Sequence, residues 1–211
     1  MKMDNEAVER FERSVTVKAQ DFGVELTDEN IRDLGRYYAL LARWNERLHL
    51  VAPCEPEEFA GRHVLESLLL LKFFSEQSRV IDVGSGGGLP IIPCLIVRPD
   101  LNATLIESSQ KKSIFLREVL KQTGTGKRGT IISQRFTDVE PPPGKFVTSR
   151  ALDDFMNQIA TLLQWAPEGS TLLLFGGESM RDKLDQLTAS YREMLIPGTE
   201  KRFLFEVRSS V

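Results

Sequence analysis

The chain has 211 residues, of which 41% are hydrophobic and 27% are charged, and its formal net charge is −3. This composition supplies enough apolar material for a hydrophobic core and excludes wholesale disorder. The weak negative charge excludes a general polyanion binder, so any nucleic-acid contact requires a local basic patch.

Helical periodicity dominates the first third of the chain. Apolar residues recur at spacings of three and four over 31–48, after the capping residue type Thr27 and its follower Asn30. A second amphipathic pattern covers 57–74, after two prolines. We therefore expect a helical extension over residues 1–75.

Short apolar runs then alternate with segments that can form helices. This alternation predicts βαβ units, and hence an α/β core at residues 76–211 with a doubly wound, mostly parallel sheet. The last run, KRFLFEVRSS, has no helix after it and predicts an antiparallel strand at the sheet edge. The apolar runs cover 79–84, 103–108, 129–134, 145–150 and 171–177, and the helical segments cover 89–98, 110–122, 152–164 and 178–190.

The first of these runs ends in an acid and a glycine-rich turn, DVGSGGGLP. Ligands of doubly wound sheets bind beyond the carboxyl ends of the strands, and glycines let the backbone approach them closely. Asp82, directly before the turn, can accept hydrogen bonds from loop amides or reach a positive group of the ligand. Glu107, at the end of the next run, suits hydrogen bonding to ribose hydroxyls. The sequence therefore predicts a nucleotide site at this turn.

The spacing of the glycines favours S-adenosylmethionine over a dinucleotide. A pyrophosphate loop has the pattern G-x-G-x-x-G, but Leu89 occupies the position of its last glycine. Pro90 follows near the helix start, where a missing N–H costs little. An aspartate followed by G-x-G-x-G is typical of class I methyltransferases, whose ligand carries a cationic sulfonium and no pyrophosphate. A nicotinamide dehydrogenase is the less favoured alternative.

Longer motifs carry a more specific resemblance. The stretches DVGSGGGLPIIPCLIVRPDL, LIESSQKKSIFLREV, SQRFTD and VTSRAL, with RYYALLARWNERLHLV upstream, resemble segments of one family. It is the bacterial small-subunit rRNA guanine-N7 methyltransferase family, also called glucose-inhibited division protein B, and the similarity covers about residues 30–210. The resemblance implies a Rossmann-like class I fold and S-adenosylmethionine-dependent methylation of guanine N7 in 16S rRNA.

The resemblance also implies which residues form the site. Arg135 and Arg150, which we expect at the carboxyl ends of adjacent strands, are the catalytic candidates and would orient the base. Phe136 and Thr137 would flank the adenine. The expected cofactor-binding residues are Asp82, Gly84, Ser85, Gly86, Leu89, Glu107, Ser108, Phe136, Thr137 and Arg150.

The expected chemistry needs no general base, because guanine N7 already offers a lone pair and loses no proton on methylation. The protein would position the substrate and exclude water. Exposed cations could bind RNA phosphates, but most such clusters are only solvated faces. The candidates are Arg43, Arg47, Arg62, Lys111, Lys112, Arg181, Lys183, Lys201 and Arg202.

Departures from the family pattern leave the substrate less certain than the cofactor. His49–Ala52, Glu66 and the pair Arg202–Phe203 differ from the family's residues, and Phe175 stands where the family has a lysine. Two alternatives therefore stay open. One is a class I methyltransferase that acts on a protein or small molecule, and the other is an inactive cofactor-binding module.

The remaining expectations concern surroundings and partners. The two cysteines and two histidines lack the spacing of metal ligands, so we expect no metal. No segment approaches about 18 apolar residues and the N-terminus has no apolar signal, so we expect a cytoplasmic protein without a membrane span. The expected partner is ribosomal RNA within the small ribosomal subunit or its precursor, bound by a monomer.

Overall fold

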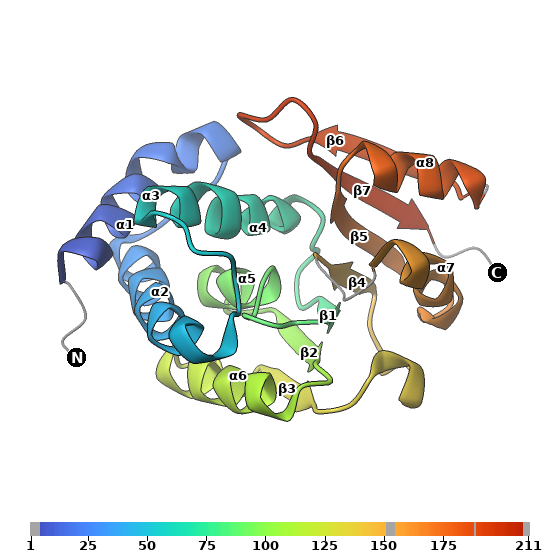
Figure 1. The fold of residues 1–211 in the computed structure, drawn as a ribbon, viewed down its shortest axis with the longest axis horizontal. Helices are drawn as coiled ribbons and strands as arrows, with labels where there is room; N and C mark the ends of the chain where they lie inside the picture. Colours follow the sequence, from blue (N-terminus) through green and yellow to red (C-terminus); the bar gives the residue numbers. More distant parts are fainter. Residues whose placement is uncertain (1–4, 151–154, 188, 209–211) are drawn as a thin grey trace.

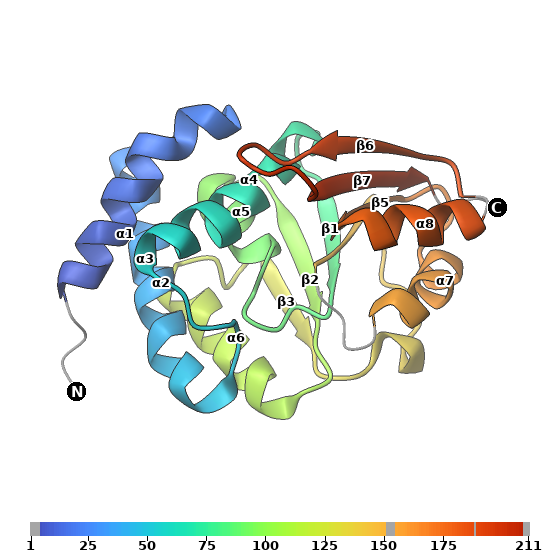
Figure 2. The same cartoon turned by 45° about the horizontal axis from the view of Figure 1, so that its top comes forward.

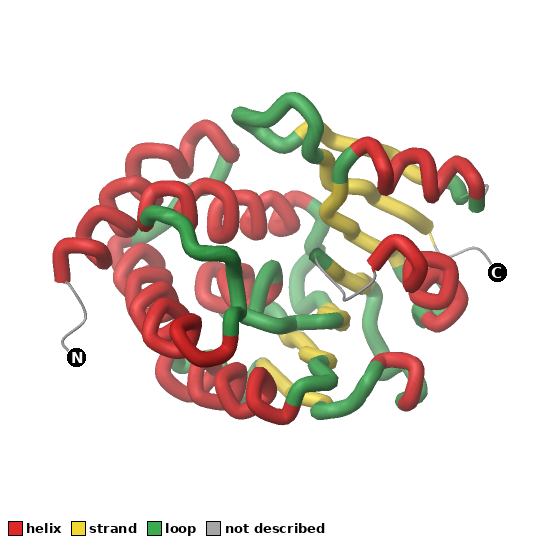
Figure 3. Tube along the Cα trace, in the orientation of Figure 1, coloured by secondary structure: helices red, strands yellow, loops and turns green. Residues whose placement is uncertain are grey.

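The computed structural model describes residues 5–150, 155–187 and 189–208. A seven-stranded sheet of order β3-β2-β1-β4-β5-β7-β6 forms its centre (Figures 1 and 3). Strands β1 to β5 pair in parallel, and β7 runs antiparallel to both β5 and β6. The strands are β1 (Arg79–Val83), β2 (Asn102–Ile106), β3 (Gly129–Ile132), β4 (Phe146–Ser149), β5 (Thr171–Gly176), β6 (Tyr191–Leu195) and β7 (Phe203–Arg208).

The predicted doubly wound, mostly parallel sheet is confirmed, with one error at its end. The C-terminal run is antiparallel as expected, but it lies inside the sheet between β5 and β6. The edge strand β6 was missed, because its sequence YREML carries two charges and continues the charged pattern of the preceding helix. That helix ends at Gln186 and not at residue 190.

Helices cover both faces of the sheet, as a doubly wound fold requires. One face carries α5 (Ile91–Val97) and α6 (Gln110–Gln122), and the other carries α7 (Phe155–Trp165) and α8 (Glu178–Gln186). Alternate residues of the central strand β1 divide accordingly: Val80 belongs to the first buried cluster and Ile81 to the second. The predicted start of α7 at residue 152 lies outside the described residues.

The N-terminal segment is helical, as its periodicity predicts. Thr27 caps α2 in a complete capping box: its side chain accepts from the amide of Asn30, whose side chain accepts from the amide of Thr27. Phe11 of α1 stacks on Tyr38 of α2 with ring centroids 4.7 Å apart. The helical elements are α1 (Asn5–Lys18), η1 (Ala19–Phe22), α2 (Asp28–Leu48), then α3 (Pro56–Glu58), η2 (Phe59–Leu65), α4 (Glu66–Leu68) and η3 (Leu69–Lys72), which follow one another without a break.

These N-terminal helices pack onto the face that carries α5 and α6 (Figure 2). Just after them, Phe74 meets Phe146 of β4 edge-on, with ring centroids 5.1 Å apart. One buried cluster therefore joins the extension to the sheet. The division at residue 75 stays a prediction about domains. Among the described residues, no helix combines the length and apolar character needed to cross a membrane.

Candidate active site

A cavity of about 630 Å³ lies at the carboxyl ends of β1, β2 and β3. It adjoins the point between β1 and β4 where the strand order reverses, the usual ligand position in this fold. The helical extension forms one side of this cavity, through the segment after α2 and the π-helical turn η2. Its lining residues are His49, Leu50, Val51, Ala52, His63, Val83, Gly84, Ser85, Gly86, Gly87, Leu89, Ile106, Glu107, Ser108, Lys112, Gln134, Arg135, Phe136, Thr137, Arg150 and Gln158.

Two glycines shape the loop after β1. Gly86 has φ +50°, and a Cβ built there would meet nothing nearer than the Gly84 carbonyl at 3.7 Å. Gly88 has φ +83°, and a Cβ there would lie 2.4 Å from Ile92 of α5. Gly86 therefore leaves backbone open to the cavity, and Gly88 lets the loop pack against α5.

Glu107 holds the glycine loop and the start of α6 together. One carboxylate oxygen accepts from the amide of Gly86 at 2.8 Å, and the other accepts from the amide of Ser109 at 2.7 Å. Ser109 is the N-cap of α6. The side chain is buried, yet each oxygen retains a lone pair that can accept from a ligand in the cavity.

Tyr37 supports the same loop from the helical extension. Its hydroxyl donates to the carbonyl oxygen of Gly87 at 2.7 Å, across 50 residues of sequence. The ring is fully buried, and this burial raises the pKa of the phenol far above its ordinary value. The hydroxyl therefore remains a donor at every physiological pH.

Asp82 lies beneath the loop and is fully buried, outside the cavity lining. One carboxyl oxygen accepts from the hydroxyl of Thr148 on β4 at 2.7 Å, and the other has no partner among the described residues. Burial raises the pKa of this carboxyl to about 7, aided by the charge of Glu107 and opposed by the bond from Thr148. The hydroxyl of Ser85 donates to the main-chain carbonyl of Asp82 at 3.1 Å.

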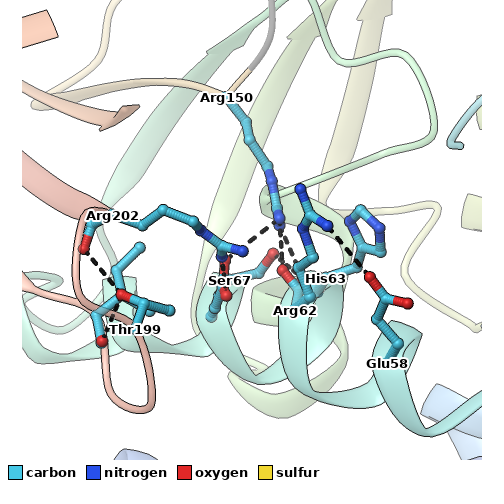
Figure 4. A network of polar contacts seen from close by, with 9 residues as sticks. Glu58, Arg62, His63, Ser67, Arg150, Thr199 and Arg202 are labelled. Atoms are coloured by element: carbon cyan, nitrogen blue, oxygen red, sulfur yellow. Dashed lines mark hydrogen bonds and ion pairs between the residues drawn. The ribbon is translucent and has the colours of Figure 1, made fainter. Parts of the chain in front are cut away.

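The opposite wall of the cavity is held by Arg150, which follows β4 (Figure 4). Its guanidinium donates to the main-chain carbonyls of Arg62 and His63 in η2, the latter at 3.1 Å. It also lies 5.6 Å from the centroid of the Phe175 ring, in a cation–π contact. Desolvation lowers the pKa of Arg150 to about 10, so it stays cationic at neutral pH.

Glu66 extends this wall to the C-terminal hairpin. Its carboxylate is only 4% exposed and pairs with Arg150 at 3.4 Å and with Arg202 on its other oxygen. Arg202 lies on the connection between β6 and β7, so a single buried acid joins three distant segments. By contrast, the neighbouring pair Glu58–Arg62 is about half exposed, at 48% and 54%.

His63 presents a half-buried imidazole at the edge of this wall. Its Nδ1 has no partner among the described residues, and its ring lies 5.0 Å from that of Phe59. Desolvation, with repulsion from Arg150, Arg62 and Arg202, lowers the pKa of His63 to about 3. The ring is therefore neutral at physiological pH.

Comparison with known proteins identifies the family. The family model described as rRNA small subunit methyltransferase G matches residues 30–207. Ribosomal RNA small subunit methyltransferase G of Xanthomonas axonopodis pv. citri is 35% identical over 179 residues, covering 82% of this chain and 84% of the relative. The Pseudomonas putida protein of the same name is 32% identical, covering 86% and 87%. The chain belongs to the rRNA small subunit methyltransferase G family.

A solved structure shows the same fold at low identity. The RNA methyltransferase from Salinibacter ruber, in complex with S-adenosyl-L-homocysteine, aligns with a TM-score of 0.52 and 14% identity, covering 74% of this chain and 93% of the other. The chain therefore has the Rossmann-like fold that its motifs imply.

The structure gathers nearly all the predicted site residues of this chain around one cavity. Among the predicted residues, only Asp82 lies outside the lining. The expected position of the two arginines is wrong: Arg135 follows β3 and Arg150 follows β4, but β2 and β1 separate these strands. β3 and β4 follow one another in sequence but are not neighbours in the sheet, because the strand order reverses beside β1.

The chemistry of the lining fits an adenosyl ligand. Gly86 provides open backbone, the oxygens of Glu107 can accept from hydroxyls, and Phe136 offers an aromatic face. Within the described residues, no three His, Cys, Asp or Glu side chains gather as metal ligands would.

Sequence reasoning missed Tyr37, Glu66 and Arg202 as structural supports of the cavity. Tyr37 lies in the apolar stripe of α2, where a buried aromatic residue is expected for packing alone. Glu66 differs from the family's aspartate, and Arg202 precedes the departure at Phe203; these departures were the one signal that set them apart. Their pairing depends on the position of the C-terminal hairpin, which no local pattern predicts.

Proposed function

We propose that this protein transfers a methyl group from S-adenosylmethionine to N7 of a guanine in 16S ribosomal RNA. It acts as a cytoplasmic monomer on the small ribosomal subunit or its precursor. The observation that carries the proposal is the single cavity at the strand ends, where the glycine loop and Glu107 meet cations from β3 and β4. Membership of the rRNA small subunit methyltransferase G family supports the substrate class.

The cofactor half of the cavity is formed by the glycine loop and the ends of β2 and β3. Gly84, Ser85, Gly86 and Leu89 contact the ligand, and Glu107 with Ser108 binds its ribose. Phe136 and Thr137 flank the adenine. When bound, S-adenosylmethionine supplies an electrophilic methyl group on a cationic sulfonium. Asp82 contributes from below, through the loop that it supports.

The substrate half has the opposite character, because cations lie at its rim. Arg135 is exposed at the end of β3 and can reach the guanine oxygen or a flanking phosphate. Arg150 is committed to carbonyls of η2, so it orients the base by holding the wall that includes His63. Neither arginine needs to remove a proton, since N7 carries a free lone pair. Positioning and exclusion of water are the work of the protein.

Transfer of labelled methyl to small subunits from a strain that lacks this gene tests the proposal. The expected product is 7-methylguanosine at one position of 16S rRNA, with naked 16S rRNA and ribosome-free protein extract as parallel substrates. Label in protein, or at another atom of the RNA, would overturn the assignment. Arg135→Ala should reduce turnover at least 10-fold with little change in cofactor affinity, since a charged hydrogen bond to substrate contributes about 1.5–3 kcal/mol.

Two further measurements separate the alternatives. If S-adenosylhomocysteine binds by calorimetry while no substrate accepts label, the protein is an inactive cofactor-binding module. If NAD raises the melting temperature and S-adenosylhomocysteine does not, the dinucleotide assignment replaces the proposed one. Stabilisation by S-adenosylhomocysteine alone is the result that we expect.

A further inference from the structure

Positive charge is concentrated in one segment of this weakly acidic chain. Residues 110–135, which contain α6 and β3, carry seven Lys and Arg and one acid, Glu118. The chain as a whole has a net charge of −3, so the remaining residues are strongly acidic. Such a local excess is what a nucleic-acid contact requires in a protein without overall positive charge.

A second cavity, of about 700 Å³, lies within this segment, away from the first one. Arg117 and Lys121 line it from α6, and Lys127 lines it from the turn before β3. Three glycines, among them Gly124 and Gly129, complete much of its lining. Because these glycines have no side chains, the space between the three cations stays open to a ligand.

The three cations are not neutralised by nearby acids. Among the described residues, none of Arg117, Lys121 and Lys127 forms an ion pair, and all three are exposed. Arg117 makes one neutral bond, to the hydroxyl of Ser133 at 2.9 Å. The nearby Arg128 is different, because it donates to carbonyls of the turn before β2 and supports the fold.

Most of the cations outside residues 110–135 that the sequence suggested as RNA contacts form ion pairs with acids. Arg62 pairs with Glu58, and Arg181 pairs with Glu193. Lys201 and Arg202 pair with Glu178 and Glu66 respectively. Other exposed cations, such as Arg13, Arg32 and Arg192, lie on α1, α2 and β6, whereas three unpaired cations of the described residues 110–135 line one cavity.

This surface approaches the active-site cavity through the end of β3, because Arg117 donates to Ser133, two residues before Arg135. Lys112, in the first turn of α6, and Arg135, just after β3, line the first cavity. Arg117 and Lys121 lie further along α6 and on another side of the helix from Lys112, and the 13 residues of α6 span about 20 Å. β3 is the outermost strand on this side, so nothing in the sheet separates its free edge from an approaching molecule.

We propose that Arg117, Lys121 and Lys127 form a binding site for consecutive phosphates of the RNA backbone. The RNA would run along α6 and the β3 edge, and thereby deliver the target guanine to the first cavity. This inference rests on the proposed function, because it assigns the surface by which the same substrate is held. Phosphate contacts of this kind set position and affinity and do not read sequence.

The test compares two triple variants of equal charge change. Arg117→Gln, Lys121→Gln and Lys127→Gln together remove the proposed site. The matched control is Arg13→Gln, Arg32→Gln and Arg192→Gln, which removes three exposed cations from α1, α2 and β6. Both variants are checked for melting temperature and for S-adenosylhomocysteine affinity, which should equal those of the wild-type protein.

Binding to in vitro transcribed 16S rRNA is then measured between about 50 and 200 mM salt. The site variant should bind at least 10-fold more weakly at low salt. The slope of log K against log salt should become shallower by about 2 to 3, since each lost phosphate contact contributes about 0.7–0.9. The control variant should keep the wild-type slope.

Each other outcome overturns the inference. An unchanged slope in the site variant means that these cations do not contact phosphates, and equal losses in both variants mean that only overall charge matters. A failure of the proposed function is distinguishable from both. In that case the wild-type protein transfers no methyl to RNA, while binding and its salt dependence are still measured directly.

Discussion

The two walls of the active-site cavity are built by different means. The glycine-loop wall is local: β1, its loop and β2 follow one another in sequence, and Glu107 binds Gly86 only 21 residues away. The Arg150 wall is assembled from distant segments, with Arg150 binding carbonyls that lie 87 and 88 residues earlier. The first wall carries a recognisable motif, and the second depends on how the helical extension and the C-terminal hairpin meet.

This difference separates two kinds of requirement. A loop that receives a ligand needs particular backbone conformations, which only a few residue types allow, so its sequence is diagnostic. A wall tied by buried ion pairs needs only that opposite charges meet after folding. Changes in the second wall should therefore affect stability first, and changes in the first wall should affect cofactor binding first.

The largest expected effect is on the Arg150 wall. Glu66→Ala leaves two arginines without their shared buried carboxylate, and removal of one partner from a buried pair costs about 3–5 kcal/mol. The free energy of unfolding, measured by urea denaturation, should fall by that amount. Glu58→Ala is the control on the same helical segment, because its pair with Arg62 is half exposed and contributes about 0.5 kcal/mol or less. Equal losses in the two variants would show that the buried network has no special role.

The glycine-loop wall should respond to Glu107→Ala with weaker cofactor binding. The variant removes the acceptor for the amides of Gly86 and Ser109, and hydrogen bonds to charged groups contribute about 1.5–3 kcal/mol each. We expect the dissociation constant of S-adenosylhomocysteine, measured by calorimetry, to rise about 100-fold. Glu107→Gln should give a smaller loss because its amide oxygen can still accept one bond. Glu118→Ala on α6 is the control, because among the described residues Glu118 bonds only Gln122 of the same helix and does not line the cavity. An affinity for Glu107→Ala equal to this control would contradict the role.

The same contrast explains how far the sequence predicts the molecule. The capping box at Thr27 and the parallel order of the first strands follow from local patterns and are present as expected. The prediction that Arg135 and Arg150 follow adjacent strands was wrong, because the reversal of strand order is a property of the whole sheet. The edge strand β6 was missed because its charged residues obscure any alternation. A short stretch of sequence is enough to predict a local feature such as a helix cap. A contact between distant segments depends on many residues, so no short stretch predicts it.

A change of pH should act on the Arg150 wall through His63. Its pKa is lowered from 6.5 to about 3 in the folded protein, so only the unfolded state binds a proton between these values. Stability therefore falls as the pH drops below about 6.5, by at most about 1.4 kcal/mol per pH unit. Between pH 7 and pH 5 the wild-type protein should lose about 2 kcal/mol more than His63→Gln. His49→Gln, at the exposed histidine, is the control and should retain the wild-type loss; a pH dependence unchanged by His63→Gln would exclude this residue.

The smallest expected effect tests whether the helical extension supports the glycine-loop wall. Tyr37→Phe removes the donor to the Gly87 carbonyl and leaves that oxygen unpaired, which costs about 1 kcal/mol. Because this carbonyl belongs to the loop, the affinity for S-adenosylhomocysteine should fall about 5-fold, together with a small loss of stability. Tyr38→Phe is the matched control, since the neighbouring Tyr38 of the same helix stacks its ring on Phe11 of α1. If both variants lose stability equally while cofactor affinity is unchanged, Tyr37 only packs the core, and the extension does not position the loop.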